Sequence, residues 1–191
     1  MRFILASSSP RRRELLASIG VEFDVVPSHI PEEHRVGEAP EEYVARLSRE
    51  KAEAVAARHP SQWVIAADTT VLLGDQLLEK PVDVADAQRM LATIAGRTHT
   101  VYTGVTLQNV ERQYGDTRVA ESEVRMLPLS SSDIEWYVKS GEPLDKAGAY
   151  AVQGVGAMFI DSIHGSYTNV VGLPLALLFQ MMRKADIDPL R

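Results

Sequence analysis

The sequence contains no cysteine among its 191 residues. Disulfide bonds and thiolate metal sites are therefore excluded. No apolar run approaches the ~20 residues that a helix needs to span a bilayer, and the N-terminus enters an apolar strand pattern without the features of a signal peptide. We therefore expect a cytoplasmic protein with no membrane partner.

Several common catalytic signatures are also missing. The chain has no GxxxxGK[ST] or GxGxxG motif, so neither a Walker-type nor a dinucleotide-binding fold is indicated. Its five histidines form neither HExxH nor another zinc-binding spacing. The formal net charge of -6 and the lack of an aromatic stacking stripe both disfavour nucleic acid as a partner. A small anionic ligand in a local basic pocket suits this charge balance better.

Strand-like and helix-like patterns alternate along the chain, which predicts an α/β fold. The 45% hydrophobic content is enough for one core, or for two lobes that share one sheet. No linker or repeat divides the chain, so we expect residues 1–191 to form a single domain of two lobes. The predicted strands are 3–6, 23–26, 63–67, a hairpin of 71–73 and 77–78, 100–108, 117–126 and 158–163. One predicted helix begins after the Ser9-Pro10 pair, and the other predicted helices cover 41–58, 84–95, 132–141 and 174–185.

The most informative segment is ASSSPRRRELL, from Ala6 to Leu16. It combines three hydroxyl groups, the start of a helix and three guanidinium groups. Helix N-termini present unpaired N–H groups and partial positive charge, and arginine forks match phosphate oxygens. The segment therefore suggests a phosphorylated ligand. The alternative is an ordinary helix start, with Ser9 as N-cap and Pro10 as first residue, followed by solvated arginines.

Asp68 directly follows the buried strand pattern VIAA. A carboxylate at the carboxyl end of a strand lies where open α/β sheets place ligands, although aspartate also caps turns. Lys51 and Lys80 taken alone are typical of solvated surfaces. Glu32 and Glu33 lie in a proline-rich loop that is either simply hydrated or, together with an aspartate, able to hold a magnesium-like cation.

Seven short motifs follow one another over nearly the whole chain. They are LASSSPRRRELL (5–16), REKA (49–52), AADT (66–69), EKP (79–81), GRTH (96–99), DKAGAYAVQG (145–154) and GSYTNVVGLPL (165–175). Gln153, in the glycine-rich loop of the sixth motif, adds donors and an acceptor that suit the edge of a base. The motifs and their order resemble those of the Maf nucleotide pyrophosphatases.

This resemblance implies a nucleotide diphosphatase that hydrolyses a nucleoside triphosphate to the monophosphate and pyrophosphate with a divalent cation (Mg, Mn or Co). It implies a two-lobed fold with an elongated, twisted mixed sheet, flanking helices and a central cleft, similar to the inosine triphosphate pyrophosphatases. A homodimer is also implied.

The site residues follow from the same resemblance. Ser7 and Arg12 match the residues that bind the triphosphate. Lys51 and Lys80 match the catalytic lysines. Asp68 matches the catalytic base, which shares the cation with a loop glutamate at Glu32, or at Glu33 after a shift of one residue.

Three positions resemble the members that act on dTTP and UTP. These are Arg11, Thr69 and Gln153, where members acting on 7-methyl-GTP tend to have Trp, Gln and Glu. The C-terminal segment LALLFQMMRKADIDPL instead looks more like the methyl-GTP branch. We therefore expect a dTTP/UTP pyrophosphatase, with 7-methyl-GTP as the alternative substrate. The alternative from another class is a non-enzymatic, nucleotide-binding or nucleic-acid-binding regulator of septum formation.

Overall fold

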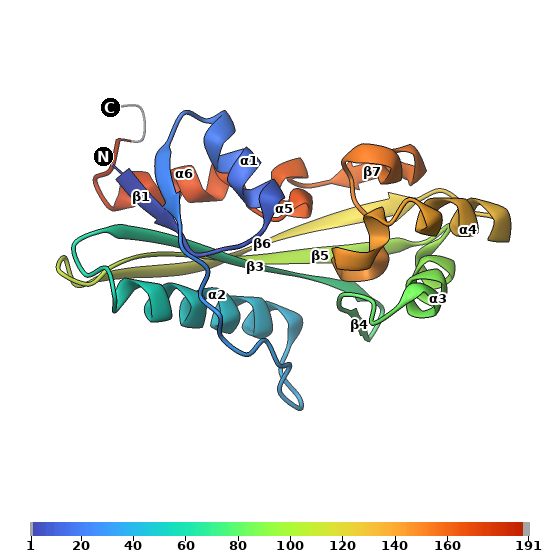
Figure 1. Cartoon of the computed structure of the whole chain (residues 1–191), viewed down its shortest axis with the longest axis horizontal. Coiled ribbons are helices and arrows are strands. Elements are labelled where there is room, and N and C mark those ends of the chain that lie inside the picture. The colour runs from blue at the N-terminus through green and yellow to red at the C-terminus, as the bar shows by residue number, and fades with distance from the viewer. Residues whose placement is uncertain (1, 189–191) are drawn as a thin grey trace. The chain divides into compact units, whose positions relative to one another are not determined.

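A computed structural model describes residues 2–188 of the chain (Figure 1). The strands are β1 (Arg2–Leu5), β2 (Glu22–Val25), β3 (Trp63–Leu73), β4 (Gln76–Leu78), β5 (Thr98–Asn109), β6 (Tyr114–Met126) and β7 (Ile160–His164). The α-helices are α1 (Pro10–Ser18), α2 (Pro40–Ala56), α3 (Val84–Ile94), α4 (Ser131–Lys139), α5 (Tyr167–Val171) and α6 (Leu175–Lys184). Short 3-10 turns cover Glu142–Asp145, Ala147–Ala149 and Gly154–Phe159.

The strands within residues 2–188 form one sheet in the order β2-β1-β3-β5-β6-β7, and β4 pairs with β3. β1 is parallel to β2 and β3, whereas β4 is antiparallel to β3 and β7 is antiparallel to β6. A mixed sheet with flanking helices confirms the predicted α/β fold class. None of the helices described in this range is long and apolar enough to cross a membrane.

The chain divides into two compact units. Among the described residues, the first unit holds 2–68, 103–120 and 172–188, and the second holds 69–102 and 121–171. Strands β3, β5 and β6 contribute residues to both units. The single domain of two lobes around a central cleft stays a prediction.

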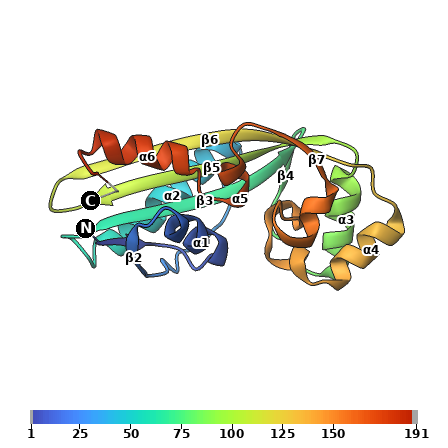
Figure 2. The same ribbon diagram turned by 90° about the horizontal axis from the view of Figure 1, so that it is seen from above.

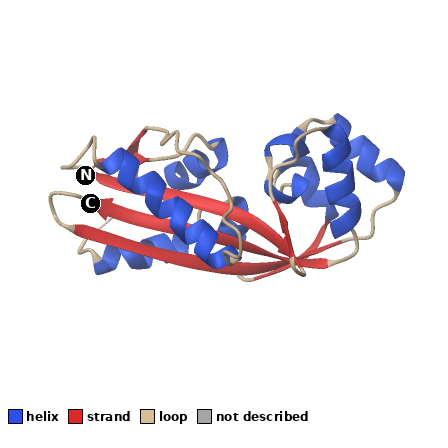
Figure 3. Cartoon of the chain, turned by 90° about the horizontal axis from the view of Figure 1, so that it is seen from below, coloured by secondary structure: helices blue, strands red, loops and turns tan. Residues whose placement is uncertain are grey.

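Helices cover both faces of the sheet in the first unit: α1 and α6 lie on one face and α2 on the other (Figures 1 and 3). Successive side chains of a strand point to opposite faces, and the sequence uses this alternation in both β1 and β3. Trp63 and Ile65 belong to the buried cluster that includes Leu16 of α1 and Leu178 of α6. The residues between and after them, Val64 and Ala66, belong to the cluster built with Ala52 and Val55 of α2.

Gly104 in β5 allows α2 to lie unusually close to the sheet. A Cβ atom built at this position would be 2.2 Å from the carbonyl oxygen of Val44 and 2.5 Å from its carbonyl carbon. Both atoms belong to the α2 backbone, so a side chain here could be accommodated only by moving the helix. The absence of a side chain at Gly104 therefore sets the distance between α2 and β5, and with it the position of every residue on the inner face of α2.

In the second unit α3 and α4 lie side by side (Figure 2). Glu142 connects α4 to the glycine-rich segment that follows. Its carboxylate accepts hydrogen bonds from the Tyr137 hydroxyl at 2.7 Å and from the backbone N–H groups of Val155 and Gly156 at 3.0 and 2.9 Å. These contacts wind residues 154–159 into a 3-10 turn. The predicted strand 158–163 therefore begins later, at Ile160.

Other element boundaries also differ from the predictions. The helix predicted at 132–141 has Ser130 as its N-cap, because the Ser130 hydroxyl accepts from the N–H of Asp133 and the Asp133 carboxylate accepts from the N–H of Ser130. The short helix α5 was not predicted. The N-cap role of Ser9 and the helix start at Pro10 are confirmed, since the Ser9 side chain accepts from the N–H of Arg12.

His99 is buried in the second unit, with 2% of its surface exposed. Its Nε2 atom lies 2.7 Å from the hydroxyl oxygen of Tyr150, and its ring meets the Tyr150 ring edge to face at 5.0 Å. Burial lowers the pKa of His99 from 6.5 to about 4, because the interior disfavours the imidazolium form. His99 is therefore neutral in the folded protein at physiological pH.

Replacement of His99 by Gln should flatten the pH dependence of the free energy of unfolding between pH 6.5 and pH 4. The unfolded chain takes up a proton near the ordinary pKa of 6.5, whereas folded His99 stays neutral until about pH 4. This residue's contribution to stability is thus complete above 6.5 and is lost as the pH falls toward 4, by about 3 kcal/mol in total. Urea unfolding at several pH values gives the free energy of unfolding of each protein as a function of pH. The same dependence on pH in wild type and in His99→Gln would contradict the prediction.

Candidate functional site

Asp68 lies in the interior of β3 rather than at its carboxyl end. The prediction of a strand over 63–67 was wrong, because β3 continues through Thr69, Thr70 and Val71 to Leu73. These β-branched residues favour extended backbone, and the single aspartate does not interrupt them. Asp68 lies two residues after Ala66, so its side chain shares the face of the sheet that α2 covers. It is 7% exposed.

Lys51 of α2 meets Asp68 on this face. Its Nζ atom donates to Oδ1 of Asp68 at 2.6 Å, and the lysine is 5% exposed. Lys51 follows Leu47 by four residues and precedes Val55 by four, which places it on the buried stripe of the helix. A lysine on an apolar stripe is a signal that sequence reasoning could have used, since lysine is rarely buried without a partner.

Glu32 supplies a second carboxylate to the same ammonium group. Its Oε1 atom lies 2.9 Å from Nζ of Lys51, and 48% of the Glu32 side chain is exposed. Glu32 belongs to the irregular segment between β2 and α2, as predicted for the proline-rich loop. Lys51 therefore lies between a buried carboxylate from the sheet and a half-exposed carboxylate from a loop. The neighbouring Glu33 instead contributes its carbonyl oxygen, which accepts a hydrogen bond from Nη2 of Arg46.

Arg12 and Ser7 lie where β1 leads into α1. The Nε atom of Arg12 donates to the carbonyl oxygen of Gly172 at 2.8 Å, and Nη1 donates to the Ser7 hydroxyl at 3.3 Å. The Ser7 hydroxyl also accepts from the N–H of Ser9. The first turn of α1 carries arginines and no acidic residue, although cations are unfavourable at the positive end of a helix. An anion bound at this end would relieve that repulsion.

The charges of this group influence one another. Burial raises the pKa of Asp68 above its ordinary value, and the positive charges of Lys51 and Arg12 act against this rise. Burial lowers the pKa of Arg12, and the negative charges of Asp68 and Glu32 act against that fall. A carboxylate whose pKa is raised is a stronger proton acceptor when ionised, and two neighbouring cations keep a fraction of it in the ionised form.

The two carboxylates are compatible with a divalent cation. Oxygens of Glu32 and Asp68 both lie within hydrogen-bonding distance of one positively charged atom, Nζ of Lys51, so they already converge on a cation. Within residues 2–188 no group of three or more His, Cys, Asp or Glu side chains could hold a metal ion. Magnesium is commonly held by one or two carboxylates, with water and substrate phosphates completing its ligands, and this pair fits that pattern.

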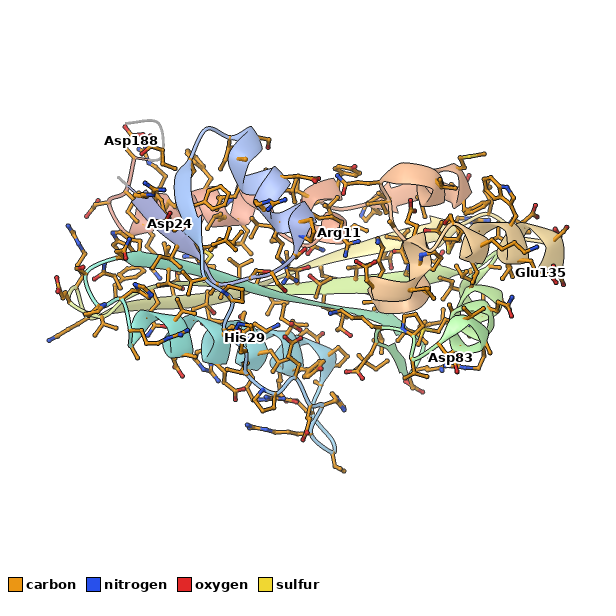
Figure 4. The ribbon with its side chains drawn as sticks, in the orientation of Figure 1. Arg11, Asp24, His29, Asp83, Glu135 and Asp188 are labelled. Carbon is orange, nitrogen blue, oxygen red and sulfur yellow. The ribbon has the colours of Figure 1, made fainter. Side chains whose placement is uncertain are left out.

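The remaining predicted site residues are distributed over both units. Arg11 is the second residue of α1 and is partly exposed (Figure 4). Thr69 follows Asp68 in β3, Lys80 is exposed after the β3–β4 hairpin, and Gln153 is partly exposed before the 3-10 turn at 154–159. These last three belong to the second unit. Their grouping with Asp68 therefore stays a prediction.

Two residues of the first unit were missed by sequence reasoning. Arg46 of α2 is 8% exposed and contacts the loop that carries Glu32. The carbonyl of Gly172 anchors Arg12 from a position 160 residues away in the chain. A backbone acceptor has no sequence signal. Arg46 follows the buried Tyr43 by three residues, so its place on the edge of the buried stripe could have been recognised.

Known proteins of one family resemble this chain over nearly its full length. Residues 2–185 match a family model described as Maf-like protein. A protein of Myxococcus xanthus named dTTP/UTP pyrophosphatase is 52% identical over 96% of this chain and 92% of its own length. Proteins with the same name are 49% identical in Geobacter sulfurreducens, over 96% of both chains, and 46% identical in Koribacter versatilis, over 98% of this chain and 96% of the relative. The Ham1 protein structure of Staphylococcus aureus covers 66% of this chain and 72% of its own at 13% identity, with a TM-score of 0.43 that carries no functional information.

Proposed function

This chain belongs to the Maf-like protein family, and we propose that it hydrolyses dTTP and UTP to the nucleoside monophosphate and pyrophosphate. The observation that carries the proposal is its 46–52% identity, over nearly the whole chain, to relatives named dTTP/UTP pyrophosphatase. The Asp68, Lys51 and Glu32 cluster supports it, because it supplies a proton acceptor and a cation beside it in the first unit.

In the proposed reaction a water molecule attacks the α-phosphorus and the bond to the β-phosphate oxygen breaks. Asp68 accepts one proton of that water, so the water oxygen becomes part of the monophosphate and pyrophosphate leaves. Lys51 holds the Asp68 carboxylate through its 2.6 Å contact and keeps it oriented toward the attacking water. Proton transfer to a positioned carboxylate typically contributes a factor of about 10²–10⁴.

Glu32 and Asp68 are the residues that would hold a divalent cation, with Mg, Mn and Co as candidates. When bound, such a cation neutralises charge on the phosphates and lowers the pKa of a coordinated water. The Lys51 ammonium would then share the two carboxylates with it. The convergence of both carboxylates on Lys51 supports this assignment.

Positive side chains would neutralise the rest of the triphosphate. Arg12 and Lys51 are the candidates in the first unit, and Lys80 is the candidate in the second. Ser7 and the N–H groups at the start of α1 would donate hydrogen bonds to phosphate oxygens. Arg12 already has its guanidinium fixed by the Gly172 carbonyl and the Ser7 hydroxyl, which reduces the entropy lost when it binds an anion.

The base would be selected by Arg11, Thr69 and Gln153. An arginine and a glutamine supply donors and an acceptor for the carbonyl and imide groups of a pyrimidine. A methylated, cationic purine would instead favour an aromatic ring and a carboxylate. A homodimer and a cytoplasmic location, which the family resemblance implies, are proposals of the same kind.

A pyrophosphate-release assay tests the proposed function. Purified protein is incubated with dTTP, UTP or 7-methyl-GTP, with magnesium, with manganese and with a chelator alone. We expect pyrophosphate from dTTP and UTP in the presence of either cation, and none with chelator. Release from 7-methyl-GTP alone would overturn the pyrimidine assignment. Nucleotide binding without release from any of the three would instead favour a binding module.

A further inference from the structure

Arg46 is a buried cation that contacts both the loop before α2 and the helix itself. Its Nε and Nη2 atoms donate to the two carboxylate oxygens of Glu38 at 2.6 and 2.7 Å, a bidentate pair. Nη1 donates to Glu50 at 3.1 Å, one turn further along α2. Nη2 also donates to the carbonyl oxygen of Glu33 at 3.0 Å. The guanidinium therefore joins the helix to both the side chains and the backbone of its neighbours.

Tyr43 makes a second contact from the same helix to this loop. Its hydroxyl donates to the carbonyl oxygen of Glu32 at 3.4 Å, and the His34 ring packs edge to face against its ring at 5.0 Å. The Arg46 guanidinium carbon lies 5.6 Å from the centre of the Tyr43 ring, within the range of a cation–π interaction. Two successive loop carbonyls, those of Glu32 and Glu33, are thus held by two side chains of α2.

The loop needs such contacts because regular structure does not hold it. Residues 26–39 form neither helix nor strand, and the Glu32 side chain is half-exposed, so packing does little to set its direction. Even so, its carboxylate lies 2.9 Å from Lys51. Lys51 and Arg46 are both on α2, so the helix fixes both ends of this arrangement.

We propose that Arg46 is a positioning residue that, with Glu38 and Tyr43, clamps the backbone of Glu32 and Glu33 and so holds the Glu32 carboxylate against Lys51. Its effect on turnover rests on the function proposed above, whereas the clamp itself does not. Arg46 touches none of the predicted site side chains directly, and acts on Glu32 through the loop backbone.

The chemistry of the pair suits a permanent clamp rather than a switch. The hydrogen bonds from Arg46 lower the pKa of Glu38 from 4.5 to about 2, so the carboxylate stays ionised over the range in which the protein works. Both side chains are about nine-tenths buried. Bidentate, charge-assisted hydrogen bonds are stronger than neutral ones. Lysine has no planar fork and could satisfy only part of this arrangement.

Kinetics in two backgrounds separate positioning from general stability. Arg46→Gln should lower kcat/KM for dTTP by about tenfold to a hundredfold, as expected for a misplaced site group. In the Glu32→Gln background the same substitution should cause almost no further loss, because the group that it positions is already gone. Arg46→Lys should be intermediate, and Arg58→Gln, in the exposed turn that follows α2, should match wild type. Equal losses from Arg46→Gln in both backgrounds would overturn the proposal.

Amide hydrogen exchange tests the clamp by a measurement that does not depend on enzymatic activity. In Arg46→Gln, residues 31–36 should exchange faster than in wild type, while β3 stays protected. Arg46→Lys provides the same comparison if the glutamine variant is poorly folded. Unchanged exchange in the loop for both variants would overturn the clamp. A wild-type protein that releases no pyrophosphate would overturn the proposed function but leave this comparison valid.

Discussion

Asp68→Asn should lower kcat for dTTP and UTP by about a thousandfold and leave nucleotide binding nearly unchanged. The amide has almost the same shape as the carboxylate but cannot accept the proton of the attacking water, and general-base catalysis is worth about 10²–10⁴. Lys51 keeps Glu32 as a charged partner in this variant, so the fold should be retained. Steady-state kinetics and calorimetric binding of dTTP provide the two measurements.

Asp75→Asn is a suitable control for this variant, because Asp75 lies in the exposed turn of the β3–β4 hairpin. It should be as active as wild type. Normal turnover by Asp68→Asn would show that another group accepts the proton. Loss of binding together with turnover would mean instead that Asp68 acts mainly by holding the ligand.

The pKa of Asp68 in the metal-free protein provides a second check. Because burial raises this pKa above its ordinary 3.8, the Asp68 carboxyl should titrate above that value when it is followed by NMR without a divalent cation. The positive charges of Lys51 and Arg12 restrain the rise, so Arg12→Gln should raise the pKa of Asp68 further. A shift in the opposite direction would contradict the charge arrangement around Asp68.

Gly104→Ala should destabilise the protein by about 2–3 kcal/mol, and Gly104→Val by more. The added Cβ atom would lie 2.2 Å from the Val44 carbonyl oxygen, and the α2 backbone cannot yield as a flexible side chain could. Overpacking of this kind typically costs about 1–3 kcal/mol and sometimes more. Urea unfolding of each variant measures the loss in free energy of unfolding, provided that its dependence on urea concentration has the same slope in all variants.

Gly115→Ala is the matched control, since Gly115 is also a strand glycine and nothing lies within 4 Å of a Cβ atom built there. Its stability should stay within about 0.5 kcal/mol of wild type. If Gly104→Ala unfolded at the same urea concentration as this control, α2 would have to move away from β5 at little cost. The Lys51 and Asp68 contact should then weaken, and activity would fall without a loss of stability.

The patterns that could be predicted from the sequence were the local ones. The Ser9 cap, the proline at the start of α1 and the hairpin between β3 and β4 each depend on a few neighbouring residues. The prediction of where β3 ends was wrong, because a single polar residue, Asp68, was weighted more heavily than the β-branched residues after it. The start of α4 at Ser131 was missed by one residue, since the three consecutive serines at 130–132 offer the same local chemistry for a cap.

For the site, the sequence by itself determined which residues are available and to which family they belong. It could indicate Asp68 and the Ser7 to Arg12 segment through their patterns, and Lys51 and Glu32 through the family resemblance. The contact of Lys51 with both carboxylates, the anchoring of Arg12 by Gly172 and the burial of Arg46 were decided only by the tertiary structure. The physical reason is that each of these contacts joins separate elements. Those atoms meet only after three features have formed. The side chains of β3 must alternate between the two faces of the sheet, α2 must lie close to the sheet at Gly104, and the loop before α2 must take its path along the helix.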